Sequence, residues 1–278
     1  MEPYAETRHQ YVEFAAHTRG ESPCFTAWAQ EVAEDREVLA WIGTLPGIKQ
    51  QPNLVFARLA RGRPLALLEV GASAGLCLHP DGFDYEWETT AGPVRIGSGG
   101  PRLRCRVTGT PPLPEAPPEV AWRGGIDLNP LDVADEEAMA WLTNLVWPEQ
   151  DERRDRLTAA IEVARRTPPT LVRGDLVEEL PALLERAAAH GPVVVFHSAV
   201  VAYLAPEERW RFAELMTGLV AEGVCHWVSN EARQVLPSIA STAPEIPEEE
   251  GAFVLGADGR AVALTHGHGQ AMTWLADR

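Results

Sequence analysis

The sequence predicts an α/β protein with a mostly parallel sheet, preceded in the sequence by a helical region. Residues 65–70 form a continuous apolar run followed at once by a glycine-rich segment, which is typical of a buried strand and a tight turn. From residue 120 onward, short apolar runs alternate with longer segments of helical periodicity. This alternation favours parallel strands joined by helices that cover both faces of the sheet.

The composition is that of a soluble globular chain of 278 residues, with 45% hydrophobic and 23% charged residues. Lys and Arg number 24 against 40 Asp and Glu, and the net charge of −16 disfavours nucleic acid and anionic membranes as partners. Lys49 is the only lysine, which excludes a phosphate loop ending in Gly-Lys-Ser/Thr. Four scattered cysteines and the lack of an apolar leader or membrane-length run indicate a reduced, cytoplasmic protein.

Residues 1–60 are expected to form a helical cap, because their apolar residues recur at helical spacing among charges. Helices are predicted there over 4–19, 25–42 and 51–59. Residues 61–278 are expected to form the main domain, with 65–70 as its first strand. Short alternating runs and a proline-rich loop predict a β-rich insertion over 83–120.

After the insertion, strands and helices alternate to the end of the chain. Strands are predicted over 120–128, 170–173, 192–196 and 224–228. Helices are predicted over 136–146, 149–166, 177–190 and 206–222. A closing hairpin joins 252–255 to 261–265 through Asp258-Gly259, and we expect it to add an antiparallel edge strand.

The segment Glu69-Val70-Gly71-Ala72-Ser73-Ala74-Gly75 has two functional interpretations. In a cofactor loop, small residues let the backbone approach the ligand, and Glu69 accepts hydrogen bonds from a polar or cationic group. In a nucleophile elbow of the form Gly-x-Ser-x-Gly, Ser73 is the nucleophile of a hydrolase. Its partners would be Asp175 and either His266 or His268. The helical character of the preceding residues favours the cofactor loop, and a plain strand-to-helix turn is the structural alternative.

Polar residues follow the later strands, where ligands gather at the carboxyl edge of a parallel sheet. Asp127 could bind ribose hydroxyls or cap a helix, and Asp175 could meet an adenine amine or cap the helix after it. His197, with Tyr203 one turn on, suits acid–base chemistry near neutral pH but could equally be structural. His266-Gly267-His268 lacks a third ligand at a helpful spacing, so we expect no metal.

In chain order, these segments resemble the motif series of the class I S-adenosylmethionine-dependent methyltransferases. The matching segments are EVGASAG from Glu69, GIDLNP from Gly125, GDL from Gly174 and FHS from Phe196. More narrowly, EVGASAGL, AWRGGIDLNPLDV, LVWPEQDERR and VVFHSAV look like an uncharacterised bacterial family, a domain of unknown function.

The resemblance implies a Rossmann-like sheet of seven strands with an antiparallel last strand, and S-adenosylmethionine as cofactor. Residues implied in cofactor binding are Glu69, Gly71, Ser73, Gly75, Asp127, Leu128, Asp175 and Leu176. His197 and Tyr203 would lie near the transferred methyl group. Two features depart from the family pattern: Ser73 replaces its middle glycine, and a long insertion separates Gly75 from Asp127.

The function expected from the sequence is methyl transfer from S-adenosylmethionine to a small molecule. Two alternatives remain open at this stage. One is a serine hydrolase that uses Ser73, and the other is a module that binds an adenosyl ligand without catalysis.

Overall fold

The computed structural model describes residues 5–17, 23–35, 51–97, 99–146, 150–244, 253–266 and 269–275. The chain divides into two compact units, residues 1–46 and 47–278. In the first unit, α1 (Ala5–His17) packs on α2 (Pro23–Glu34), and Arg8 donates to Ala33 O at 3.1 Å and pairs with Glu34 at 2.8 Å. The part of the second expected helix beyond residue 35 lies outside the described residues.

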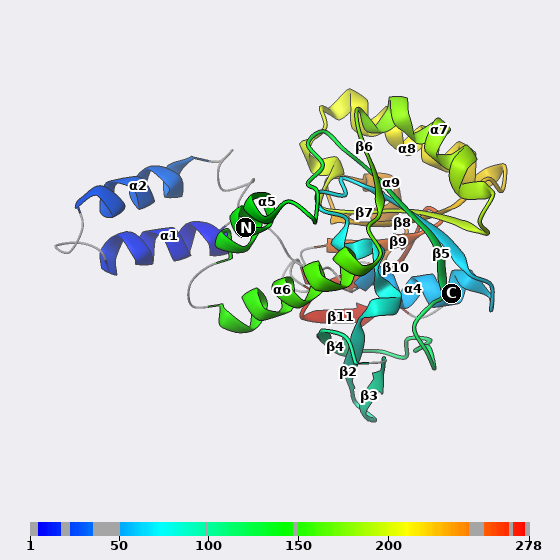
Figure 1. Ribbon diagram of the computed structural model, residues 1–278, viewed down its shortest axis with the longest axis horizontal. Coiled ribbons are helices and arrows are strands. Elements are labelled where there is room, and N and C mark those ends of the chain that lie inside the picture. Colours follow the sequence, from blue (N-terminus) through cyan, green and yellow to red (C-terminus); the bar gives the residue numbers. More distant parts are fainter. Residues whose placement is uncertain are drawn as a thin grey trace. The chain divides into compact units, whose positions relative to one another are not determined.

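The second unit begins with α4 (Gln51–Ala60), so this predicted helix belongs with the sheet. Its strands form one sheet in the order β3-β2-β4-β11-β10-β9-β8-β7-β1-β5-β6 (Figure 1). The strands are β1 (Leu65–Val70), β2 (Asp84–Thr89), β3 (Gly92–Ile96), β4 (Arg102–Thr108), β5 (Val120–Asp127), β6 (Thr170–Arg173), β7 (Val193–Ser198), β8 (His226–Ala232), β9 (Phe253–Ala257), β10 (Arg260–Thr265) and β11 (Ala271–Trp274).

Helices cover both faces of this sheet, as the alternation of elements predicts. Besides α4, the helices of this unit are η1 (Leu76–Leu78), η2 (Pro80–Gly82), α5 (Glu136–Asn144), α6 (Asp151–Arg166), α7 (Leu176–Ala188), η3 (Val201–Tyr203), α8 (Pro206–Ala221) and α9 (Pro237–Ala240). Leu65 and Leu67 of β1 pack into the core with α4 and α6, whereas Ala66 and Leu68 face the core with α7 and α8. The strictly buried strand therefore separates two hydrophobic layers.

The five strands β6, β5, β1, β7 and β8 run parallel. Among these five strands, β5 and β6 follow β1 in the chain and lie on one side of it, whereas β7 and β8 come later and lie on its other side. The strand order thus reverses between β1 and β7. Ligands of open α/β sheets bind outside the carboxyl ends of the strands at this kind of switch point.

The prediction of seven strands is wrong, because the sheet of the described residues has eleven strands. Strands β2, β3 and β4 of the insertion join it through the pairing of β4 with β11. Their inward side chains, such as Tyr85, Trp87 and Leu103, belong to the main core, so the insertion extends the sheet.

The closing hairpin forms as predicted, with β9 and β10 joined through Asp258 and Gly259, which both have positive φ. The prediction that it lies at the edge of the sheet is wrong, because β10 pairs with β11 and β11 with β4 of the insertion. The antiparallel strand next to β8 is β9, the first strand of the hairpin, and β11 follows antiparallel to β10.

Candidate functional site

The glycine-rich loop after β1 folds over the end of β5. Its left-handed residues are Gly71 (φ 71°), Ser73 (φ 50°) and Gly75 (φ 68°). The N–H groups of Gly71 and Ala72 both donate to Ile126 O, at 2.8 and 3.0 Å. The N–H of Ser73 donates to Asp127 Oδ2 at 2.8 Å. Three successive backbone donors of the loop are therefore directed at β5.

Glycine is required at two loop positions because protein side chains approach the backbone there. A Cβ on Gly71 would lie 2.5 Å from both Cγ atoms of Val200, in the segment after β7. A Cβ on Gly75 would lie 2.6 Å from Pro169, just before β6. Because both residues also have a positive φ, a larger side chain would be strained as well as crowded.

Asp127 lies half-buried at the carboxyl end of β5, beside this loop. Besides the bond from Ser73, its Oδ1 accepts the N–H of Asn129 at 2.7 Å. The helix-cap interpretation of Asp127 is wrong, since α5 is capped by Asp135, which accepts the N–H groups of residues 137 and 138. Each carboxylate oxygen has two lone pairs, so Asp127 keeps acceptor capacity for hydroxyl groups of a ligand.

The turn after Asp127 is held in place by Arg173 at the end of β6. Arg173 donates to Leu128 O at 3.2 Å and to Asn129 Oδ1 at 3.0 Å. The side of the turn that faces solvent carries Leu128, which is 74% exposed. An exposed leucine directly beside Asp127 gives this edge of the sheet an apolar surface.

Asp175 caps α7, which confirms the structural alternative given for it. Its Oδ1 accepts the N–H groups of Val177 at 2.8 Å and Glu178 at 3.2 Å. Leu176 is the first residue of α7 and packs, half-buried, against the core beneath that helix. Asp175 itself is exposed, and the cap leaves its Oδ2 available.

His197 is fully buried, and both of its ring nitrogens are hydrogen-bonded within the protein. Nε2 accepts the indole N–H of Trp227 at 3.0 Å, and Nδ1 lies 2.8 Å from Glu231 Oε1. Because an indole nitrogen can only donate, Nε2 carries no proton and Nδ1–H is the donor to Glu231. This geometry favours the structural interpretation of His197, since neither nitrogen is open to a bound molecule.

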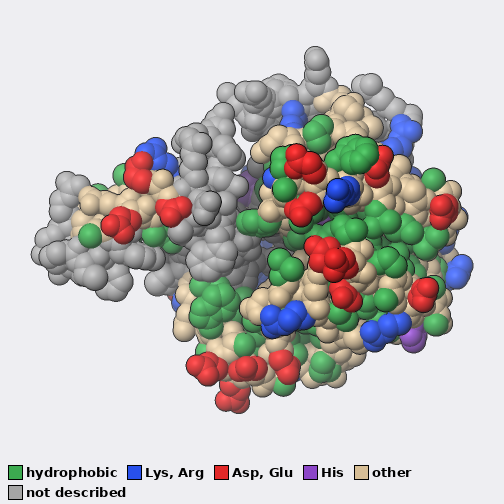
Figure 2. Space-filling model, turned by 90° about the horizontal axis from the view of Figure 1, so that it is seen from above, with side chains coloured by type: hydrophobic (Ala, Val, Ile, Leu, Met, Phe, Trp, Pro, Cys, Tyr) green, Lys and Arg blue, Asp and Glu red, His purple; other side chains and the backbone are tan. Residues whose placement is uncertain are grey.

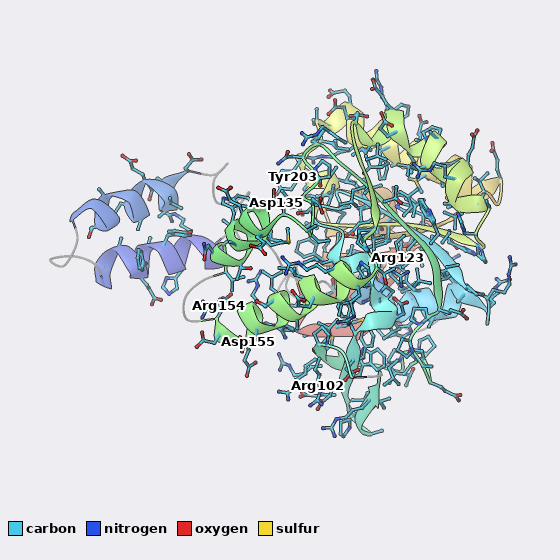
Figure 3. The ribbon with its side chains drawn as sticks, in the orientation of Figure 1. Arg102, Arg123, Asp135, Arg154, Asp155 and Tyr203 are labelled. Carbon is cyan, nitrogen blue, oxygen red and sulfur yellow. The ribbon has the colours of Figure 1, made fainter. Side chains whose placement is uncertain are left out.

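Tyr203, by contrast, is exposed at the edge of the sheet. It ends η3, in the segment after β7, and 53% of its surface is accessible. In Figure 3, Tyr203 and Asp135, which follow β7 and β5, lie toward the same end of the sheet. Tyr203 therefore remains a candidate to face a molecule bound there.

Hydrogen-bonded polar side chains join three strands near their ends. The sequence offers residues 229–231 at this point as groups that could line a pocket or cap. Asn230 is fully buried; its Nδ2 donates to Ser198 Oγ at 2.8 Å, and its Oδ1 accepts from Thr265 Oγ1 at 2.6 Å. Glu69, which is 8% exposed, pairs in register with Phe196 of β7. Phe196 lies two residues before Ser198, so Glu69, Phe196 and Ser198 share one face of the sheet. The run of polar residues Ser229-Asn230-Glu231, directly after the predicted strand 224–228, is the signal that points to this network.

The segment between the loop and β2 is fixed by buried polar groups. His79 is 1% exposed, and burial together with the nearby charges of Arg123 and Arg166 lowers its pKa to about 3. Arg123 pairs with Asp81, and the hydroxyl of Tyr85 donates to Pro80 O at 2.7 Å. Burial also raises the pKa of Tyr85 well above its usual value.

The fold and the loop define an α/β protein with a candidate ligand edge on its central strands. Residues 55–274 match the family described as "Uncharacterized protein conserved in bacteria (DUF2332)", and the chain belongs to this family. No curated protein and no solved structure matches the chain.

The described residues contain no helix that is long and apolar enough to cross a membrane. They also contain no group of three or more His, Cys, Asp or Glu residues placed to hold a metal ion. His268, one of the two histidines considered for a metal pair, lies outside the described residues.

Proposed function

We propose that the chain binds S-adenosylmethionine at the carboxyl edge of β1, β5 and β7 and transfers its methyl group to a small molecule. The observation that supports this most is the junction of the glycine-rich loop with Asp127. The two lie at the carboxyl ends of the adjacent strands β1 and β5, and the hydrogen bond from Ser73 joins them. Strand β1 borders the point where the strand order reverses.

The use of the loop's donors favours a ligand without a phosphate at this position. A loop that binds phosphate directs successive backbone N–H groups at the anion. Here the N–H groups of residues 71–73 are bonded to Ile126 and Asp127. The Asp127 carboxylate keeps acceptor capacity for a ligand, and the Glu69 carboxylate lies on the adjacent strand β1. Ribose hydroxyls and the methionine ammonium group are suitable donors to carboxylates.

The surroundings of Asp127 also suit an adenosyl group. Leu128 offers an exposed apolar side chain on which an adenine ring would pack. Across the face seen in Figure 2, acidic and basic side chains are both scattered among apolar ones. The net charge of −16 favours a small-molecule acceptor over a nucleic acid.

When bound, S-adenosylmethionine supplies a methyl group that is already activated for transfer. The protein then has to align the acceptor and, where the acceptor carries a proton, provide a place for that proton to go. His197 is not proposed as the base, because Trp227 and Glu231 occupy its nitrogens. Tyr203 is the exposed polar side chain that we propose faces the acceptor.

Titration calorimetry of the purified chain with S-adenosylhomocysteine tests this proposal. We expect micromolar binding, a loss of about tenfold or more in Asp127→Asn, and no binding of ADP. Asp258→Asn is the matched control, because Asp258 accepts the N–H of Trp227 at 2.8 Å at the amino end of β8, away from the proposed edge. Absence of binding, or equal affinity in both variants while both remain folded, contradicts the proposal.

A serine hydrolase is a second candidate, favoured by one observation. Ser73 is exposed and adopts a left-handed conformation, and strained residues of this kind cluster at functional sites. Its proposed partners lie apart from it: Asp175 caps α7, and His266 follows β10, the fourth strand from β1 in the sheet. Labelling by a fluorophosphonate probe that is lost in Ser73→Ala would support the hydrolase. Binding of S-adenosylhomocysteine without methyl transfer to any acceptor would support a non-catalytic module.

A further inference from the structure

A buried carboxylate holds the backbone of the segment that follows β7. Glu231 lies on β8 and is 2% exposed. Its Oε1 accepts three hydrogen bonds: from His197 Nδ1 at 2.8 Å, from the N–H of Val200 at 2.9 Å and from the N–H of Val201 at 3.0 Å. Bonds to an ionised acceptor are about twice as strong as bonds between neutral groups. One side chain of β8 therefore fixes two consecutive residues of the neighbouring segment.

Trp227 determines which ring nitrogen of His197 carries the proton. Its indole N–H donates to His197 Nε2, so the histidine proton stays on Nδ1, facing Glu231. The imidazole also packs edge-on against Phe212 of α8, with the ring centroids 5.4 Å apart. The position of the Glu231 carboxylate is thus set by a chain of side chains from both β8 and α8.

The guanidinium of Arg209 binds the later part of the same segment, at Ala202 and Leu204. Arg209 of α8 donates from Nε to Leu204 O at 2.8 Å and from Nη2 to Ala202 O at 2.5 Å. The segment needs such support, because Ala199 adopts a left-handed conformation with φ 57°, which is unfavourable for a residue other than glycine. A carboxylate binds its N–H groups, and a guanidinium binds its carbonyl groups.

The segment after β7, residues 199–203, contacts the glycine-rich loop directly. A Cβ placed on Gly71 would lie only 2.5 Å from each Cγ atom of Val200, so the Val200 side chain packs against the backbone of Gly71. Val200 is also one of the two residues whose N–H is bonded to Glu231. Any shift of the Glu231 carboxylate is therefore transmitted through Val200 to the loop that begins at Gly71.

We propose that Glu231, supported by His197, is a positioning residue of the ligand site. It holds residues 199–203 against the glycine-rich loop, so that both sides of the edge are formed before a ligand arrives. The contact between the two segments stands on the geometry alone, and its role in binding rests on the proposed function.

Hydrogen exchange of the full chain tests the contact without any ligand. In Glu231→Gln a neutral amide replaces the carboxylate, and we expect the N–H groups of Val200 and Val201 to exchange about tenfold faster. The N–H groups of Gly71 and Ala72 should follow them. The matched control is His226→Gln, which breaks another histidine–carboxylate pair, with Asp258, at the opposite end of β8 and should leave all four unchanged. Unchanged exchange in Glu231→Gln overturns the proposal.

A second variant protects the test against general unfolding. Val200→Ala removes the side-chain contact with Gly71 but keeps the bonds to Glu231, so only Gly71 and Ala72 should exchange faster. If their exchange is unchanged, the two segments are not coupled.

The affinity for S-adenosylhomocysteine then tests the role in binding. We expect about a tenfold loss in Glu231→Gln and none in His226→Gln. Faster exchange with unchanged affinity means that Glu231 is structural only and overturns the positioning role. If the unmodified chain does not bind S-adenosylhomocysteine, the proposed function fails, and the exchange of Gly71 and Ala72 alone decides whether Glu231 holds the loop.

Discussion

Replacing His197 by phenylalanine should destabilise the protein strongly, although the ring shape is kept. The change leaves the buried indole N–H of Trp227 without its acceptor and removes one of the three donors to Glu231. An unsatisfied buried donor costs about 1–3 kcal/mol, and a hydrogen bond to a charged group contributes about 1.5–3 kcal/mol. Because the two groups belong to one network, their effects do not add fully, and we expect a total loss of about 3–5 kcal/mol.

Chemical denaturation measures this loss, provided that the denaturant dependence of the two proteins is the same. The matched control is His226→Phe, which removes a histidine 2.8 Å from Asp258. The side chains of that pair are 31% and 32% exposed, so its removal should cost less than about 1 kcal/mol. If His197→Phe costs no more than His226→Phe, the buried network does not have the strength argued for it.

Three further changes test separate parts of the structure. Gly71→Ala should cost about 1–3 kcal/mol more than Gly62→Ala in denaturation, because both glycines have positive φ but only Gly71 has a neighbour in the place of the Cβ; equal costs would refute the close contact with Val200. His79 has a pKa of about 3 in the folded protein and about 6.5 when unfolded, so its contribution to stability is complete above pH 6.5 and is lost as the pH falls toward 3. Denaturation at several pH values should show a shallower acid decline in His79→Leu, and an identical decline would contradict the burial argument. Asp175→Ala should lower the thermal stability by about 1 kcal/mol through loss of the cap on α7; a large loss of S-adenosylhomocysteine affinity would instead give Asp175 a role in binding.

Local patterns were sufficient to predict most elements of the fold. The apolar run of β1, the turn at Asp258-Gly259 and the alternation after residue 120 all depend on neighbours in the sequence, and the structure confirms them. The size of the sheet depends on distant pairings. Strand β11 has only four residues, and its pairing with β4 joins parts of the chain far apart in sequence, so no local pattern reveals it.

The candidate site shows the same division between local and distant information. The order of motifs predicted which residues stand at the ends of the central strands, because that follows from the alternation of strands and helices. Whether each side chain is already engaged could not be predicted. The bond from Trp227 to His197 spans 30 residues, and the bond from Ser73 to Asp127 spans 54. Such contacts appear only when the strands are assembled.

An adenosyl ligand is proposed to bind where the glycine-rich loop meets the end of β5, and backbone amide chemical shifts can be mapped during titration with S-adenosylhomocysteine. We expect the amides of Ser73, Leu128 and Asn129 to shift with saturation, whereas those of β2 and β4 in the insertion should not. Saturable shifts confined to another part of the chain, or none at all, would contradict this binding site.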